Sequence, residues 1–329
     1  MSTSDHIERV SAVLEGRQPD RPPVSFWHHF DTHQRCGPAA VQAHLDHVRT
    51  YDLDFLKVMN DNGYPKPCEL TSVRDLEALQ PQSGEEPEFA RQLELLEALS
   101  GELSGHVLMA TTLFNAWATL RKLIKPKPKP GPPDLTIVQA EADRILAEFL
   151  AEDCEAVARA VRVIAESLTR FAARCVQAGA DGIFLSVRDD WLDSDPDTPG
   201  SYDELVRPTD LQILGGVSDA RFNMLHVCGR PLNFAAFAEY PVHVINWADR
   251  AAGPSIAEAI KTTPPAICGG VDNLAELPNG TAQQVAAQVR DALAQADERP
   301  ILIGPGCTFD PQVVPSENLH AMCEAARSA

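Results

Sequence analysis

The sequence predicts an α/β fold, a (β/α)8 TIM-type barrel built as a single domain over residues 1–329 with an N-terminal helix and insertions. Eight short apolar runs alternate with helical patterns along the chain. Several runs are almost continuously apolar, as expected for parallel strands that are buried on both faces. The 329 residues exceed the ~250 that are typical of such a barrel. An open doubly wound sheet is the alternative, and the count of eight runs favours the barrel.

The expected elements follow one another regularly. The strands are expected at 24–30, 54–60, 106–113, 182–187, 222–228, 243–248, 266–272 and 300–307. Helical patterns cover the polar N-terminus up to residue 20, then 38–51, 155–180, 281–296 and 316–329. Thr281 and Ser316 are expected N-caps, because their hydroxyl oxygens can accept hydrogen bonds from the first turn of a helix.

Two segments lack any regular pattern. The proline-rich stretch 125–134 is expected to be an extended connection, because proline disrupts both helices and sheets. The acidic stretch 188–204 contains Trp191 and follows the fourth expected strand. Loops at the carboxyl ends of barrel strands carry function, so Trp191 is a candidate for the substrate pocket.

The composition narrows the class of protein. A formal net charge of −19 argues against nucleic acid or an anionic membrane as the main partner. No run approaches the ~20 apolar residues of a membrane span, and the N-terminus has no apolar signal core. We therefore expect a cytoplasmic protein that does not associate with membranes. In that compartment the eight cysteines are expected to be thiols, metal ligands or core residues, not disulfides.

A metal site is predicted where the fifth and eighth strands end. His226 and Cys228 are two residues apart, so in an extended strand their side chains lie on the same face. Cys307 ends the eighth strand, and closure of a barrel would bring it to the same rim. One imidazole and two thiolates suit zinc. The alternative is that these are ordinary buried side chains, as expected for the cysteines in helical patterns and for Cys268 within the seventh strand.

Four polar residues of the first two strands are further candidates. His28 and His29 are adjacent, so one of them is expected to face the pocket. Lys57 lies in an apolar strand, where an unpaired ammonium group is costly, so a partner is expected at Asp61 or Asp54. Asp61 could act as a general acid or base or could accept a hydrogen bond from the substrate. We take Asp61 and His28 as catalytic candidates and His29 and Lys57 as pocket candidates.

Two more pocket candidates follow from position alone. Asn246 lies at the end of the sixth expected strand, and Asp272 ends the seventh. Asp272 could orient His226 through its second ring nitrogen, since histidines that bind metals usually have such a partner. Either residue could instead cap the helix that follows.

The sequence resembles the uroporphyrinogen decarboxylase superfamily, which includes zinc-dependent methylcobamide:thiol methyltransferases. The resemblance spans nearly the whole chain, is most specific from residue 178 onward and implies a (β/α)8 barrel. It rests on the stretches RQPDRPPVSFWHHF, DLDFLKVMND, GADGIFLS, LHVCGRPLN, VHVINWADR, ICGGVDN and GPGCTFDPQVVPSENLHAMCEAAR.

The resemblance implies one of two reactions, because the superfamily contains methyltransferases and decarboxylases. The methyltransferases bind zinc through an H-x-C motif and a distant cysteine, which match His226, Cys228 and Cys307. The decarboxylases use no metal, and they bind substrate carboxylates through arginines that follow an arginine-proline-proline motif. Here SFWHHF follows Pro23 instead, and Asp61 only approximates the position of their catalytic aspartate. A net charge of −19 also suits an eight-carboxylate porphyrinogen poorly, unless a local basic pocket overrides it.

The expected function is therefore zinc-dependent transfer of a methyl group from a methylated corrinoid to a small thiol-type acceptor. The corrinoid is expected on a separate partner protein or in solution, because this chain has no D-x-H-x-x-G motif. A metal-free decarboxylase acting on uroporphyrinogen or a related carboxylate is the alternative. A third possibility is a barrel without catalysis that binds a ligand or a partner, and an open coordination site on zinc would count against it.

Overall fold

The computed structural model describes residues 4–124, 135–188, 202–229 and 232–329, and its core is one parallel β-sheet. Seven parallel strands pair in chain order to form a curled half-barrel, which is compatible with a TIM-like barrel. The strands are β1 (Phe55–Val58), β2 (Leu108–Phe114), β3 (Gly182–Arg188), β4 (Met224–Cys228), β5 (Val244–Trp247), β6 (Ala266–Val271) and β7 (Leu302–Pro305). Trp191 and the connection 125–134 lie outside the described residues.

The first expected strand, 24–30, is not a strand in the structure. It makes only isolated parallel bridges, one from Val24 to Ile303 and one from His28 to Phe309. The Val24 carbonyl nevertheless accepts a hydrogen bond from the Asp54 amide, which directly precedes β1. The segment thus lies between β7 and the start of β1, where the first expected strand would have closed the barrel. No longer ladder forms, because Pro22 and Pro23 have no N–H group and because the Phe26 carbonyl is bound by the His47 side chain.

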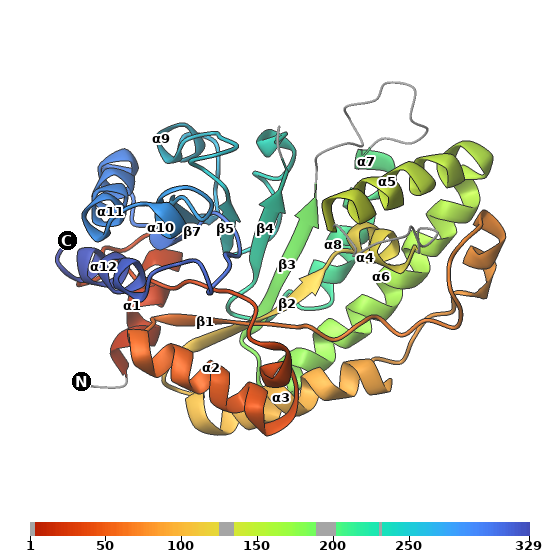
Figure 1. The fold of residues 1–329 in the computed structure, drawn as a ribbon, viewed down its shortest axis with the longest axis horizontal. Helices are drawn as coiled ribbons and strands as arrows, with labels where there is room; N and C mark the ends of the chain where they lie inside the picture. Colours follow the sequence, from red (N-terminus) through yellow and green to blue (C-terminus); the bar gives the residue numbers. More distant parts are fainter. Residues whose placement is uncertain (1–3, 125–134, 189–201, 230–231) are drawn as a thin grey trace.

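The helices cover the outside of the curled sheet (Figure 1). The α-helices are α1 (Ser4–Leu14), α2 (Gly37–Tyr51), α3 (Pro87–Leu103), α4 (Ala116–Leu123), α5 (Leu135–Glu152), α6 (Cys154–Gln177), α7 (Tyr202–Leu205), α8 (Arg207–Gly215), α9 (Ile256–Ala259), α10 (Glu276–Asn279), α11 (Ala282–Ala296) and α12 (Ser316–Arg327). Short 3-10 helices are η1 (Thr32–Gln34), η2 (Val73–Ala78) and η3 (Phe234–Ala236).

The two predicted helix caps have different outcomes. The Thr281 hydroxyl accepts a hydrogen bond from the Gln284 amide in a capping box, as predicted. The prediction for Ser316 is wrong, because Ser316 is already the first residue of α12 and Pro315 occupies the N-cap. The ring of Pro315 fixes φ and so delimits the helix without a side-chain hydrogen bond.

Two apolar clusters hold the sheet from its two sides. Alternate strand residues such as Leu56, Ile183 and Leu225 belong to the larger cluster, which includes the helices. The residues between them, such as Phe55 and Phe184, belong to a smaller cluster on the inner face of the sheet. Because side chains alternate along a strand, this division determines which polar side chains face inward.

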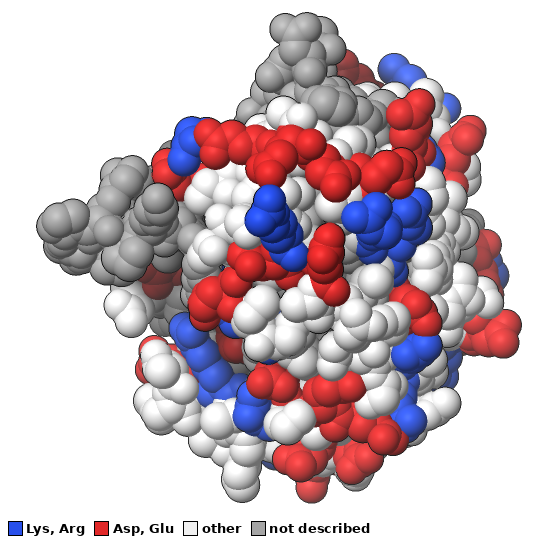
Figure 2. Space-filling model, turned by 90° about the vertical axis from the view of Figure 1, so that its right-hand side faces the viewer, with Lys and Arg blue, Asp and Glu red and all other residues white. Residues whose placement is uncertain are grey.

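Acidic side chains are more frequent than basic ones on the face drawn in Figure 2, although the two kinds are interspersed. This agrees with the 47 acidic and 28 basic residues of the whole chain. None of the described helices is both long enough and apolar enough to cross a membrane.

Candidate metal centre

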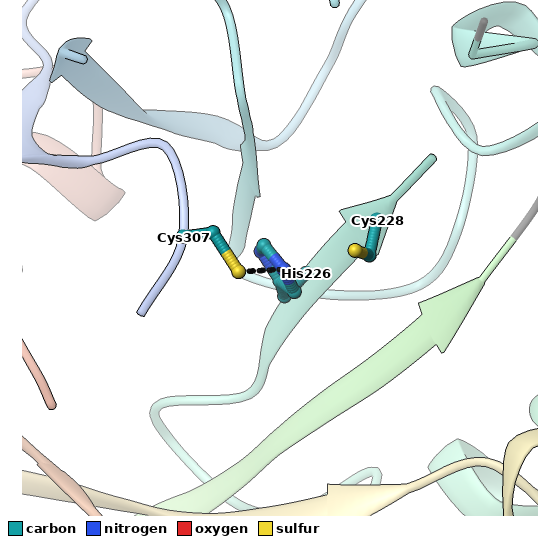
Figure 3. A group of neighbouring side chains, drawn as sticks. All are labelled: His226, Cys228 and Cys307. Atoms are coloured by element: carbon teal, nitrogen blue, oxygen red, sulfur yellow. Dashed lines mark hydrogen bonds between the residues drawn. The ribbon is translucent and has the colours of Figure 1, made fainter. Parts of the chain in front are cut away.

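His226, Cys228 and Cys307 meet at the carboxyl ends of the strands (Figure 3). His226 and Cys228 come from β4, and Cys307 comes from the segment after β7. One possible ligand atom from each residue lies within 4.8 Å of the others. The sequence-based expectation that two strand ends bring these three residues together agrees with this geometry.

The distance between Cys307 and His226 is the one expected for two ligands of a tetrahedral zinc ion. Zinc–nitrogen and zinc–sulfur bonds of the usual lengths at a tetrahedral angle place the two donor atoms about 3.5 Å apart. The Cys307 sulfur lies 3.4 Å from His226 Nε2. A hydrogen bond from Cys228, assisted by the nearby His226 and Lys57, also holds the pKa of the Cys307 thiol well below its usual range. The cluster is therefore suited to a soft divalent cation.

A buried asparagine fixes which nitrogen of His226 faces the cysteines. Asn246 lies beside His226 in the β4–β5 register, and its Oδ1 accepts a 2.6 Å hydrogen bond from His226 Nδ1. The orientation of the Asn246 amide is set by its Nδ2, which donates to the carbonyls of Cys268 and Pro305. In the neutral imidazole Nδ1 therefore carries the hydrogen, and Nε2 presents its lone pair toward Cys307.

Asp272 does not have the role expected of it. Its carboxylate accepts hydrogen bonds from the backbone amides of Leu274 and Ala275, in a turn after β6. The orienting partner of His226 is Asn246 instead. Asp272 caps a local turn. It is not the expected cap of the following helix either, because α10 begins at Glu276 with Ala275 as its N-cap.

The cluster opens into a cavity of about 280 Å³. Its walls combine aromatic rings, hydroxyl groups and cations on the inner side of the sheet. The described lining residues are Trp27, His29, Lys57, Met59, Asn60, Thr112, Phe114, Ala118, Arg121, Lys122, Phe184, Ser186, Val187, Arg188, His226, Cys228, Cys307 and Thr308. We call it the metal cavity. Such a volume suits a small molecule.

A second cavity of about 430 Å³ adjoins the first. His29, Asn60, Phe114 and Lys122 line both of them. Asp61 lines only the second cavity, where it is hydrogen-bonded to His29 Nδ1 at 2.7 Å. Burial alone would raise the pKa of Asp61, but this hydrogen bond and the nearby Arg35 lower it. Asp61 is thus a carboxylate near neutral pH and is better suited to accept a hydrogen bond than to donate a proton.

His28 lines neither cavity. Its Nδ1 is hydrogen-bonded to the His29 carbonyl, and its ring packs against Phe30, His47 and Phe309. Burial lowers its pKa. Of the two adjacent histidines, His29 therefore faces the site, and His28 has no part in the function proposed below.

Lys57 lines the metal cavity, and neither of the two expected carboxylates forms a direct ion pair with it. Asp61 pairs with His29, and Asp54 pairs with Arg9 and Arg21 at the other end of β1. The expected direct pairing is therefore wrong, although the nearby Cys307 and Asp61 still favour the charged form of Lys57 and oppose the lowering of its pKa by burial.

Three cations of the metal cavity were missed by the sequence analysis. Arg121 and Lys122 lie on α4, and Arg188 ends β3. Arg188 could have been found from its place at the end of an apolar run. Nothing in the sequence pattern assigned the two residues of α4 to the cavity, since that depends on how α4 packs over the strand ends.

Comparisons with known proteins place this α/β chain in a family. The family model for uroporphyrinogen decarboxylase (URO-D) matches residues 56–329. The chain belongs to this family. None of the curated proteins matches it in sequence.

One solved structure supports the fold. A methyltransferase from Methanosarcina mazei superimposes with a TM-score of 0.70 at 16% identity, over 98% of each chain. A B12-independent methionine synthase from Shewanella sp. W3-18-1 has a TM-score of 0.46 at 12% identity, over 72% of this chain and 65% of that one. The first of these likenesses shows that the fold is that of a known methyltransferase.

Proposed function

We propose that this protein is a zinc-dependent methyltransferase that moves a methyl group from a methylated corrinoid to a small thiol. The observation that carries the proposal is the cluster of His226, Cys228 and Cys307, with the His226 lone pair directed at Cys307 by Asn246. We further propose that the corrinoid is bound to a separate protein. When bound, zinc would lower the pKa of a thiol that ligates it, so that the thiol reacts as a nucleophile near pH 7.

The chain's own residues would hold and shield the reacting groups. His226 is 4% exposed, and its ring is stacked on Phe184 with 5.6 Å between the centroids. Trp27, which is also buried, forms an edge contact with Phe184. These rings would exclude water from one side of the ligand cluster, which strengthens electrostatic interactions there. The open side of the cluster faces the metal cavity, where the acceptor would bind.

Decarboxylation of a porphyrinogen or related acid is the second candidate. It is supported by the basic side chains Lys57, Arg121, Lys122 and Arg188 on the cavity wall, which would attract carboxylates despite the net charge of −19. The soft ligand cluster has no role in such a reaction. We therefore rank it below methyl transfer.

The test begins with metal content. The protein purified without chelator should contain about one zinc per chain. Cys307→Ser should weaken zinc binding at least as much as the loss of an outer partner, which costs about 10- to 100-fold. Cys268→Ala is the matched control, because Cys268 is a buried cysteine of β6 that belongs to the inner apolar cluster.

Turnover is then measured with methylcobalamin and a thiol, by the change in corrin absorbance. Chelation of zinc should abolish turnover and added zinc should restore it. Retention of zinc by Cys307→Ser would remove Cys307 from the ligand set. Release of carbon dioxide from uroporphyrinogen by the metal-free protein would favour the decarboxylase instead.

A further inference from the structure

Cys228 and Cys307 are two thiols that face each other at the carboxyl ends of the strands (Figure 3). Their sulfur atoms lie within 4.8 Å of each other, and a hydrogen bond links the two groups. Neither residue is part of a disulfide. Besides binding a metal, two thiols this close can be joined to each other when an oxidant reaches them.

The distance between the two sulfurs can be closed without moving the backbone. A disulfide bond is about 2.05 Å long, so sulfurs that lie within 4.8 Å of each other must approach by no more than roughly 2.8 Å. A cysteine side chain has one rotatable bond before its sulfur, and a step from one staggered rotamer to another moves the sulfur by roughly 3 Å. A rotamer change in one of the two residues therefore covers the distance.

Contacts within the chain hold both cysteines in place. Cys228 pairs with Arg188 at the last position of the β3–β4 register. On either side of Cys307, the Gly306 amide donates to a carbonyl of β6, and the Thr308 carbonyl accepts from a side chain that follows β6. These contacts do not involve a metal, so they keep the two thiols close together whether or not one is bound.

An oxidant can reach these two thiols more easily than the buried ones. Cys228 and Cys307 are partly exposed and line the metal cavity of about 280 Å³, which has room for a peroxide. Cys175, Cys268 and Cys323 are buried, and burial raises the pKa of each of their thiols. Little of the reactive thiolate therefore forms at these three positions.

A disulfide and a bound zinc ion exclude each other at this site. Two sulfurs on one tetrahedral zinc ion lie about 3.8 Å apart, whereas the sulfurs of a disulfide are about 2.05 Å apart. Zinc also requires thiolates, which a disulfide no longer provides. Oxidation would leave only His226 of the three candidate ligands, whereas a catalytic zinc site uses three. Oxidation should therefore release zinc, and bound zinc should protect the thiols.

We propose that Cys228 and Cys307 form a redox-sensitive switch, in which a hydroperoxide converts the zinc site into a disulfide. With hydrogen peroxide, one thiol is first oxidised to a sulfenic acid and one water is released. The second thiol then displaces the hydroxyl group of the sulfenic acid as a second water, and the sulfur–sulfur bond forms. The release of zinc rests on the function proposed above, whereas the disulfide rests on the geometry of the two cysteines alone.

The first experiment treats the metal-free protein with one equivalent of hydrogen peroxide. Mass spectrometry should show the loss of two hydrogen atoms from the chain, and peptide mapping should join the peptides that contain Cys228 and Cys307. In Cys228→Ser and Cys307→Ser this link cannot form, and the remaining thiol should gain oxygen instead. Cys154→Ser is the matched control, because Cys154 is also partly exposed but lies on α6. Thermal unfolding shows that each variant is folded.

The second experiment measures the competition between zinc and oxidation. Free zinc at about ten times its dissociation constant should slow disulfide formation about tenfold, because only the metal-free fraction can react. The oxidised protein should bind zinc more than about 100-fold more weakly than the reduced protein, since even the loss of an outer partner costs about 10- to 100-fold. A dithiol reductant should restore the affinity, which is measured by competition with a chromophoric chelator.

The outcomes separate this inference from the proposed function. The inference is overturned if the peroxide leaves both thiols of the metal-free protein reduced, or if it oxidises them separately without joining them. Equal zinc affinity of the oxidised and the reduced protein would also overturn it. Failure of the reduced protein to bind zinc would instead contradict the proposed function, while peptide mapping of the metal-free protein still decides whether the two thiols form a disulfide.

Discussion

Asn246 offers a way to perturb the proposed metal centre without changing a candidate ligand. Asn246→Leu removes the acceptor of His226 Nδ1 and the donors to the carbonyls of Cys268 and Pro305. Loss of such an outer partner costs about 10- to 100-fold in metal affinity, which is about 1.4–2.7 kcal/mol. Each buried group left without a partner costs about 1–3 kcal/mol of folding free energy, so we also expect a loss of stability of about 3 kcal/mol or more.

Asn246→Asp separates these two effects. A carboxylate still accepts from His226 Nδ1, but it cannot donate to the two carbonyls. We therefore expect zinc affinity within a few-fold of the wild type together with a clear loss of stability. Zinc affinity is measured by competition with a chromophoric chelator, and stability by urea unfolding of the metal-free protein.

Asn223→Leu is the control for general destabilisation. Asn223 is also buried, and its amide bridges the Val217 carbonyl and the Ile183 amide at the amino end of β4. It should cost stability while leaving zinc affinity unchanged. The reasoning is refuted if Asn246→Leu binds zinc as tightly as the wild type, or if Asn223→Leu weakens zinc binding equally.

Two further predictions concern carboxylates away from the metal. Asp54→Ala should lower the free energy of unfolding by about 3–5 kcal/mol, because it leaves Arg9 and Arg21 without their buried partner. Urea unfolding measures this loss. The zinc content should not change, since Asp54 precedes β1 and lies at its amino end. Burial raises the pKa of Asp210 to about 6, so the unfolded chain loses this proton at lower pH than the folded protein does. The free energy of unfolding of the wild type, relative to that of Asp210→Asn, should therefore fall by about 3 kcal/mol between pH 4 and 6 and stay constant above pH 6. A difference in urea midpoints that does not change with pH would contradict this.

The strands could be predicted from the sequence because parallel strands that are buried on both faces consist mainly of consecutive apolar residues. Seven of the eight runs contain strands, with the expected division into inner and outer faces. The run at 24–30 is also rich in apolar residues, yet its pairing is limited by neighbouring side chains. His47, on α2, binds the Phe26 carbonyl, and no pattern within the run reveals that a side chain 21 residues away replaces a ladder partner.

The three metal-ligand candidates could also be predicted from strand geometry. The residue that orients His226 could not be predicted in this way. The spacing of His226 and Cys228 fixes their common face by strand geometry alone. The pairing of His226 with Asn246 depends on the register between β4 and β5, which the connection between the strands determines. Lys57 and Asp61 are four residues apart, but β1 ends at Val58, so Asp61 lies where the chain has already left the sheet and joins His29.

Backbone contacts hold the segment that carries Cys307. The Gly306 amide donates to the Val271 carbonyl at 3.0 Å. A side chain at position 306 would begin 2.7 Å from the Ala248 Cα atom, so only glycine allows the backbone after β7 to approach the end of β5 this closely. The same β5 contributes Asn246, which binds both His226 and the Pro305 carbonyl. The position of Cys307 relative to His226 is therefore set by backbone contacts around β5, and this preorganisation is what a tight metal site requires.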